Sequence, residues 1–134
     1  MLFGRTLKPF PMSYQSFEKL DVWKRASRLA VSVCQQVLPG QCRALADQMH
    51  RAAISIPSNI AEGAERDSTA DFARFLRIAK GSCSELRTQI YIARELGLVQ
   101  PAEAASWVSE TKEINAMLQG LIFSMQRKGI PSEN

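Results

Sequence analysis

Residues 68–97 read STADFARFLRIAKGSCSELRTQIYIARELG, and this stretch decides the fold class. Ser68 and Asp71 stand three residues apart, as in a capping box that has Asp in place of Glu and opens an α-helix. Gly97 suits the left-handed residue that closes one. Between these ends, apolar residues recur every three or four positions, the period of a helix with one buried face. They are Phe72, Phe75, Leu76, Ala79, Cys83, Leu86, Ile90 and Ala93.

The same spacing recurs along the chain and predicts an all-α protein with four amphipathic helices. The expected ranges are about 21–38, 41–64, 68–96 and 101–128. Pro57 falls inside the second helix, where it cannot donate to the carbonyl of Ala53, so we expect a kink at Pro57. Because the links are short, the sequence predicts an antiparallel up-down-up-down four-helix bundle.

The composition is that of one globular domain. The chain has 134 residues, of which 46% are hydrophobic and 22% charged, enough to bury a single core. We expect the bundle at 16–128, an irregular N-terminal arm at 1–15 and a C-terminal tail at 129–134. Met12 is an alternative start to Met1, and the intact mass of the native protein would distinguish the two.

Cysteine usage and charge restrict the setting of the protein. Cys34, Cys42 and Cys83 are odd in number and accompany one histidine, which argues against a disulfide framework or a zinc site. No apolar run of about 18 residues and no signal peptide are present, so we expect a cytoplasmic protein without a membrane span. The net charge of +4 permits an anionic partner without requiring one.

Two stretches of the chain resemble a bacterial protein family. They read FEKLDVWKRASRL (17–29) and RAAISIPSNIAEGAERDSTADFARFLRIAKGSCSELRTQIYIARELG (51–97). The chain is similar to the four-helix-bundle proteins encoded in intervening sequences of 23S ribosomal RNA genes, relatives of the accessory protein of diversity-generating retroelements. The resemblance is most specific at 55–63 and at 81–86. It implies a ring-like homopentamer with a basic surface and, for the retroelement relative, binding to nucleic acid and to a reverse transcriptase.

Basic residues and one tyrosine follow a flank of the expected third helix at 4-3-4-3 spacing. Such a row can track a phosphate backbone while Tyr91 offers a stacking face, and the first helix carries a second basic cluster. The predicted nucleic-acid contacts are Lys24, Arg25, Arg28, Arg77, Lys80, Arg87, Tyr91 and Arg94. Glu85 and Glu95 share the third helix, so helix faces that are merely solvated are the alternative interpretation.

Apolar and polar residues outside the buried stripes predict self-association. A monomeric bundle needs one apolar stripe per helix, and extra apolar surface usually marks a partner. The predicted subunit interface comprises Arg51, Ser55, Ser58, Asn59, Glu62, Arg66, Ile78, Ile92, Leu96 and Phe123. For the polar part of this set the alternative is that Ser and Asn side chains satisfy backbone groups freed near Pro57.

No catalytic site, metal or cofactor is expected. Di-iron bundle sites need two Glu-x-x-His motifs, whereas Asp47 and His50 form a single pair at that spacing. Cys34 and Cys83 fall on or beside apolar stripes, where cysteine behaves as a small hydrophobe. Gly81 stands alone in a helix instead of in a phosphate-binding loop, and we expect it to permit close packing.

Three functions therefore stay open, in this order. The first is a non-enzymatic homo-oligomeric scaffold that binds nucleic acid, together with a protein partner such as the reverse transcriptase that the resemblance implies. The second is a protein-interaction assembly whose positive charge only keeps it in solution. The third is an enzyme whose site forms at a subunit boundary.

Overall fold

The computed structural model describes residues 16–36 and 40–128, and within these ranges all regular structure is helical. Two short 3-10 helices, η2 (Phe17–Lys19) and η3 (Gly40–Cys42), precede the first and second α-helices. The α-helices are α1 (Asp21–Gln35), α2 (Arg43–Ala64), α3 (Thr69–Glu95) and α4 (Pro101–Lys128). The prediction of an all-α chain with four helices is confirmed for this part of the chain. None of these helices is long and apolar enough to cross a membrane.

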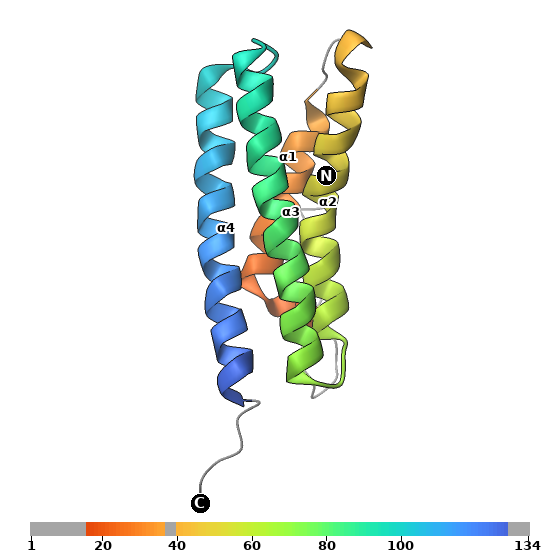
Figure 1. The fold of residues 1–134 in the computed structure, drawn as a ribbon, viewed down its shortest axis with the longest axis vertical. Coiled ribbons are helices and arrows are strands. Elements are labelled where there is room, and N and C mark those ends of the chain that lie inside the picture. The colour runs from red at the N-terminus through yellow and green to blue at the C-terminus, as the bar shows by residue number, and fades with distance from the viewer. Residues whose placement is uncertain (1–15, 37–39, 129–134) are drawn as a thin grey trace, which may run out of the picture.

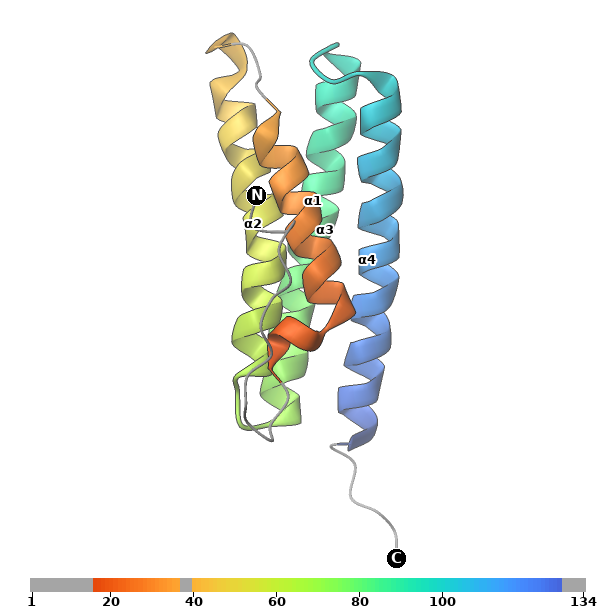
Figure 2. The same ribbon diagram turned by 180° about the vertical axis from the view of Figure 1, so that it is seen from behind.

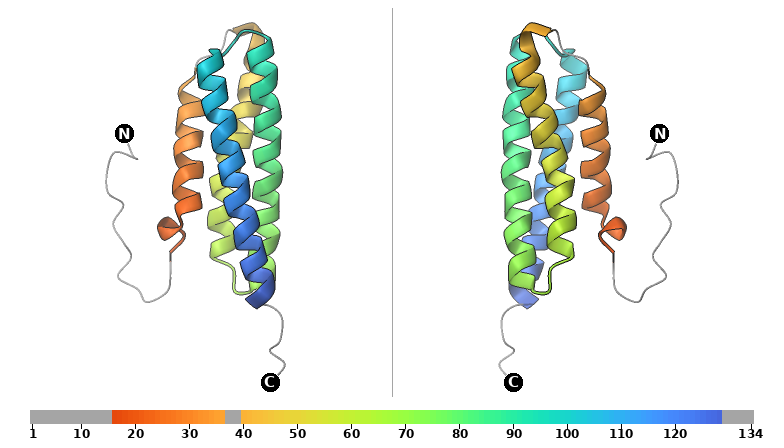
Figure 3. Two further views of the ribbon diagram at one scale, coloured as in Figure 1. Left: turned by 90° about the vertical axis from the view of Figure 1, so that its left-hand side faces the viewer. Right: turned by 90° about the vertical axis from the view of Figure 1, so that its right-hand side faces the viewer.

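The helices lie along one another as an elongated bundle (Figure 1). Both α1 and α3 pack against α2 and α4, so α1 and α3 stand at opposite corners (Figure 3). Successive helices run in opposite directions along the long axis in Figures 1 and 2, which is compatible with the predicted up-down-up-down order. α3 therefore has one neighbour on each side, and its remaining surface faces outward.

The core is built from the apolar stripes that the spacing predicts. Each α-helix contributes side chains that are essentially inaccessible to water, and each such side chain stabilises the fold by about 1.5–3 kcal/mol. The largest are Val33, Met49, Ile56, Ile60, Leu76, Leu86, Ile90, Ile114 and Leu118. The stripes from four helices meet along the bundle axis and fix which face of α3 is left outside.

Both ends of α3 form as the sequence signals predict. The Ser68 side chain accepts a hydrogen bond from the Asp71 amide at 3.0 Å, which satisfies one free donor of the first turn. At the other end Gly97 has a φ of 72°, and the Leu98 amide donates to the Ala93 carbonyl at 2.9 Å. This is the Schellman arrangement, in which a left-handed glycine lets the chain turn back at once.

The ends of α1 and α2 differ from the prediction. α1 stops at Gln35, because Gln36 is extended, with a ψ of 123°. The predicted end at Leu38 is too late, because a proline disfavours the helical conformation of the residue before it and Leu38 precedes Pro39. α2 begins at Arg43, since the preceding residues form η3. The expected arm at 1–15, the tail at 129–134 and the alternative start at Met12 lie outside the described residues, and the domain boundaries remain predictions.

Pro57 is buried within α2, and the helix is assigned without interruption from Arg43 to Ala64. The surrounding packing offsets the cost of the missing hydrogen bond, about 3 kcal/mol in an unsupported helix. A change of helix direction at Pro57 remains a prediction.

Candidate functional site

The outward surface of α3 has two sides, which two hydrogen bonds define. Ser82 Oγ lies 2.8 Å from Ser55 Oγ of α2, and Lys80 Nζ donates to Oε1 of Gln119 of α4. Steps of three and four residues from Ser82 and Lys80 assign the other positions to one side or the other. The apolar flank, towards α2, consists of Ile78, Ile92 and Leu96. The basic flank, towards α4, consists of Arg77, Lys80, Arg87, Tyr91 and Arg94.

Most cations of the basic flank lack a partner carboxylate within the described chain. Among these residues no ion pair involves Arg77, Lys80 or Arg87. Arg94 lies 5.1 Å from the ring centroid of Tyr91, and its Nη2 is 3.2 Å from a carboxylate oxygen of Glu95. Arg77 and Arg94 are exposed, whereas Lys80 and Arg87 are half-buried. The basic flank therefore keeps most of its positive charge uncompensated.

The second predicted basic cluster lies on α1, away from the basic flank. Arg25 forms an ion pair with Glu110 of α4, and its Nη1 is 3.7 Å from Met117 Sδ. The hydrogen bond to Glu110 raises the pKa of the Arg25 guanidinium. Arg28 is exposed and Lys24 half-buried. Because α1 and α3 stand at opposite corners, the eight predicted nucleic-acid residues divide between two surfaces, and Arg25 joins α1 to α4.

Part of the predicted polar interface forms a hydrogen-bond network between α2 and α3. Asn59 Nδ2 donates to the Ser55 carbonyl at 2.8 Å and to Ser55 Oγ at 2.9 Å, and Ser55 Oγ bonds to Ser82 Oγ. Pro57 has no amide hydrogen to donate to the Ala53 carbonyl. The Asn59 side chain does not replace this bond, because it donates to Ser55. The two most specific segments of the family resemblance meet in this network, which favours a structural role for Ser55 and Asn59.

The C-terminal part of the predicted polar interface, Glu62 and Arg66, connects α2 to the start of α3. Arg66 Nη2 is 2.9 Å from Glu62 Oε1, and Arg66 Nε is 3.8 Å from Asp71 Oδ2. The guanidinium carbons of Arg66 and Arg74 lie 4.8 and 4.4 Å from the ring centroid of Phe75. Exposed ion pairs contribute about 0–1 kcal/mol each. This end of the predicted interface is therefore engaged within the chain.

The two remaining polar residues of the predicted subunit interface face solvent. Arg51 and Ser58 are both exposed on α2. In the described ranges neither takes part in an ion pair. Of the polar interface residues, these two are the ones left available for a neighbouring subunit.

Gly63, instead of Gly81, is the glycine that allows close packing. A Cβ added at Gly63 would lie 2.7 Å from the Cβ of Phe75 and 3.0 Å from Cδ1 of Phe72. At Gly81, which is exposed, an added Cβ meets nothing within 4 Å. The expectation for Gly81 is wrong because its position points away from both neighbouring helices. The sequence alone does not distinguish the two positions, because both are isolated glycines within a helix.

Exposed apolar side chains lie on more than one face. Leu96, Ile92 and Ile78 are 60%, 46% and 42% exposed and occupy the apolar flank. Phe123 is 56% exposed but lies one turn after Gln119, which places it on the side of α4 that meets the basic flank. The structure therefore separates Phe123 from the apolar residues with which the sequence grouped it. Ile54 of α2, 51% exposed, was not predicted.

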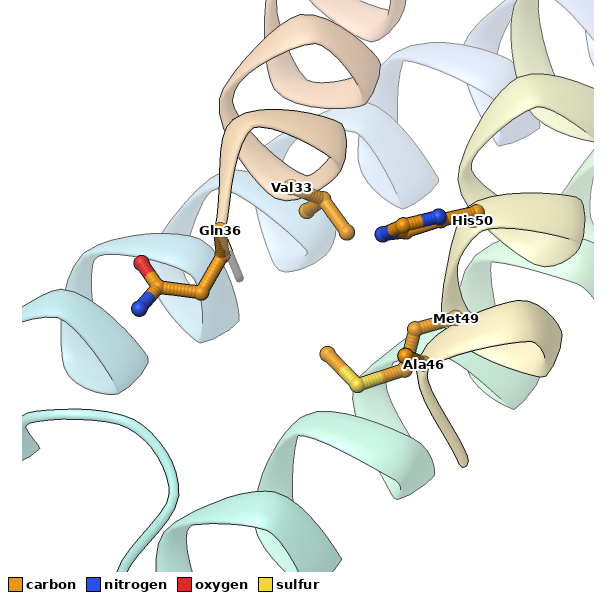
Figure 4. A pocket seen from close by; sticks show the side chains of 5 residues that line it. All are labelled: Val33, Gln36, Ala46, Met49 and His50. Carbon is orange, nitrogen blue, oxygen red and sulfur yellow. The ribbon is translucent and has the colours of Figure 1, made fainter. Parts of the chain in front are cut away.

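A narrow hollow lies between the last turn of α1 and the start of α2 (Figure 4). It has no room for a water molecule, although His50 points across it towards Val33. Its lining residues are Val33, Gln36, Ala46, Met49 and His50. Asp47 is exposed, and in the described ranges no three His, Cys, Asp or Glu side chains lie together as metal ligands would.

A second hollow, open and of about 460 Å³, lies at the opposite end of α2. It is lined by Phe17, Ala61, Glu62, Glu65 and Arg66. Glu62 and Arg66 already bond to each other there. The polar groups of this hollow are thus partly satisfied within the chain.

Two of the cysteines have raised pKa values. Cys83 is buried, its Sγ donates to the Thr111 carbonyl at 3.1 Å, and burial raises the pKa of its thiol to about 11. Burial also raises the pKa of Cys34. Thiolates are the nucleophilic form of cysteine, so a raised pKa opposes reactivity at neutral pH. Cys34 is exposed, so of these two cysteines only Cys83 has a packing role, and the raised pKa values of both thiols oppose catalysis by them.

Comparison with known proteins identifies a protein family and similar solved structures. A sequence model described as 23S rRNA-intervening sequence protein matches residues 18–120. The chain resembles a solved protein of unknown function from the S23 ribosomal protein family of Bacteroides thetaiotaomicron VPI-5482, with a TM-score of 0.70 and 24% sequence identity. The match covers 75% of this chain and 97% of that chain, and it shows a shared helical fold. No curated protein matches.

Proposed function

The chain belongs to the 23S rRNA-intervening sequence protein family, and on that premise we propose that it is a non-enzymatic, homo-oligomeric scaffold that binds nucleic acid. In this proposal the scaffold unit is an antiparallel up-down-up-down bundle. The observation that carries the proposal is the basic flank of α3, whose cations stand mostly without carboxylate partners in the described part of the chain. Contacts of this kind bind phosphates in a salt-dependent manner and discriminate little between sequences.

Self-association is the second element of the proposal, and the apolar flank supports it. Ile78, Ile92 and Leu96 are exposed next to α2, where Arg51 and Ser58 also face outward. Burying such side chains between copies would remove them from water, whereas a monomer leaves them solvated. We propose the pentamer that the family resemblance implies, with the cytoplasm as the compartment and a reverse transcriptase as a further partner. Genes next to the coding sequence would test the last point.

Binding of labelled structured RNA and duplex DNA across a salt series tests the nucleic-acid function. We expect binding at low salt, and a loss of about 30- to 100-fold when Arg87 and Arg94 both become Glu. The matched control is Lys19→Glu with Arg43→Glu, which makes the same change in net charge at exposed positions outside the basic flank and the predicted interface. Absence of binding at low salt, or equal losses in both double variants, would overturn the assignment to the basic flank.

A protein-interaction assembly without nucleic acid is the second candidate. Arg25 and Arg66 support it, because both use their charge on carboxylates of the same chain. Such pairs show that part of the positive charge serves the fold. Under this candidate Arg87→Glu with Arg94→Glu leaves the oligomeric state unchanged and no nucleic acid binds. Metal analysis of the purified protein tests the non-enzymatic assignment, since a stoichiometric bound metal would contradict it.

A further inference from the structure

We propose that the seam between α3 and α4 binds single-stranded nucleic acid, with Tyr91 and Phe123 as stacking platforms for its bases. The proposal rests on the nucleic-acid function proposed above and adds the strandedness of the ligand. α3 and α4 lie side by side along most of their length (Figures 1 and 3). The seam is defined as the basic flank of α3 together with the exposed residues of α4 on the same side.

The two aromatic rings stand near opposite ends of this seam. Tyr91 lies eleven residues after Lys80, three helical turns away, and is 37% exposed. Phe123 lies four residues after Gln119, the partner of Lys80. Because α3 and α4 are antiparallel, these steps lead in opposite directions from the Lys80–Gln119 contact. At about 1.5 Å per residue the rings are about 22 Å apart along the axis.

Positive charge fills the space between the rings. Lys80 and Arg87 lie between them on α3, and both are half-buried. Lys112, two turns before Gln119, is exposed on the same side of α4. Beyond them, Arg94 packs 5.1 Å from the Tyr91 ring centroid, which leaves the other ring face for a base.

Carboxylates near the middle of α4 lie on another side of that helix. Glu110 and Glu113 both raise the pKa of Arg25, so they lie towards α1 and away from the seam. At the seam itself Glu95 stands next to Arg94 and bonds to it. The cations of the seam thus exceed its carboxylates among the described residues, as a strand of phosphates requires.

Two exposed rings separated by cations suit a single strand better than a nucleic-acid duplex or a protein helix. A duplex stacks its base faces internally and offers only edges and phosphates, so exposed rings add nothing to its binding. A docking helix needs apolar anchors three, four and seven residues apart, whereas these rings are isolated by cations. Unstacked bases on a flexible backbone use both features, because aromatic platforms bind any base and the cations follow the phosphates.

Fluorescence anisotropy with labelled oligothymidylate and oligouridylate of about 12 nucleotides, and with a duplex of the same length, tests the inference. Phe123→Leu and Tyr91→Leu should each weaken single-strand binding by about 5- to 100-fold, and the salt slope should stay unchanged. Duplex affinity should hardly change. Phe123→Trp and Tyr91→Phe, which keep a stacking ring, should restore binding. The two single strands distinguish DNA from RNA as the source of the ligand.

Different experimental outcomes would overturn the proposed nucleic-acid function and the proposed stacking sites. If wild-type protein binds none of the probes at low salt, both the proposed function and this inference fail. If Arg87→Glu with Arg94→Glu weakens binding but Phe123→Leu and Tyr91→Leu do not, the proposed function stands and the stacking sites are wrong. If Phe123→Leu instead dissociates the oligomer in light scattering, Phe123 belongs to a subunit interface and the inference fails. Equal losses for single strands and duplex also overturn the inference.

Discussion

The apolar flank and the basic flank lie on one helix, but they differ in what remains exposed. Apolar side chains are exposed on the first, and uncompensated positive charge is exposed on the second. Towards α2, the Ser55–Ser82 bond joins the two helices, and the exposed apolar side chains of Ile78, Ile92 and Leu96 lie beside it. Towards α4, the Lys80–Gln119 bond joins the helices without neutralising any charge. Exposed hydrocarbon is stabilised by a surface that excludes water, and uncompensated charge by an anion. One helix thus presents two surfaces suited to two different kinds of partner.

The largest expected effect comes from placing charge on the apolar flank. We expect Ile78→Glu with Ile92→Glu to weaken self-association by at least about 4 kcal/mol, because two buried interface anchors become ionised. Analytical ultracentrifugation of the variant measures this loss. Ala102→Glu with Ala116→Glu, at exposed positions of α4 outside the predicted interface, is the control and should assemble normally. Loss of assembly in the control alone would break the comparison by moving the interface to α4.

The core side of α3, beneath both flanks, should respond to high pH through Cys83. Its folded pKa of about 11 exceeds the ordinary value of 9.0, so the unfolded chain loses the thiol proton first. Stability fully present below pH 9 is therefore lost as pH rises towards 11, by about 2–3 kcal/mol.

Urea unfolding of wild type and Cys83→Ala across this pH range isolates the effect. Other groups titrate equally in both proteins, so the difference between them should shrink or change sign as pH rises. A difference that is constant with pH would show that the thiol stays protonated in both states or ionises in both.

A change at Gly63 tests how closely α2 approaches α3 on the side of the apolar flank. Gly63→Ala should destabilise the protein by about 2 kcal/mol, because the new methyl group overlaps Phe75. Gly81→Ala, on the open surface of α3, should instead stabilise it by about 0.5–1 kcal/mol through helix propensity. Thermal unfolding followed by circular dichroism measures both. Equal shifts in the same direction would contradict the asymmetric packing.

The smallest expected effect concerns the Ser55–Ser82 bond, which fixes the apolar flank beside α2. Ser55→Ala and Ser82→Ala should each cost about 1 kcal/mol. In a double-mutant cycle their coupling should be about 0.5–1 kcal/mol, because the two hydroxyls bond to each other. Additive losses would mean that the hydroxyls act independently and would weaken the assignment of Ser82 to the α2 side.

Sequence periodicity predicted the helices and most of the core because one buried stripe needs a local repeat. It also gave the angles between residues around α3, and so separated the isoleucines from the arginines. It did not tell which set faces α2 and which faces α4, since that depends on the hand in which four helices are arranged. Phe123 was grouped with Ile78 for this reason.

Contacts between residues distant in sequence escaped prediction for a related reason. Arg25 and Glu110 are 85 positions apart, and neither stands in a local pattern that marks a pair. Gly63 and Gly81 also look alike as isolated glycines in helices. Only the close approach of Phe75 to Gly63 distinguishes them. That approach depends on how closely the end of α2 packs against the start of α3.

The short length of α1, which begins part of the way up the bundle, has a consequence for local unfolding. At about 1.5 Å per residue α1 extends about 22 Å, whereas α4 extends about 42 Å. Figure 2 shows that α1 begins well above the turn from α2 to α3, where the lower end of the bundle has η2 in place of a fourth helix. Amide hydrogen exchange should therefore be fastest in the last turns of α4 and slowest near Ile114, so that this end opens while the rest stays closed.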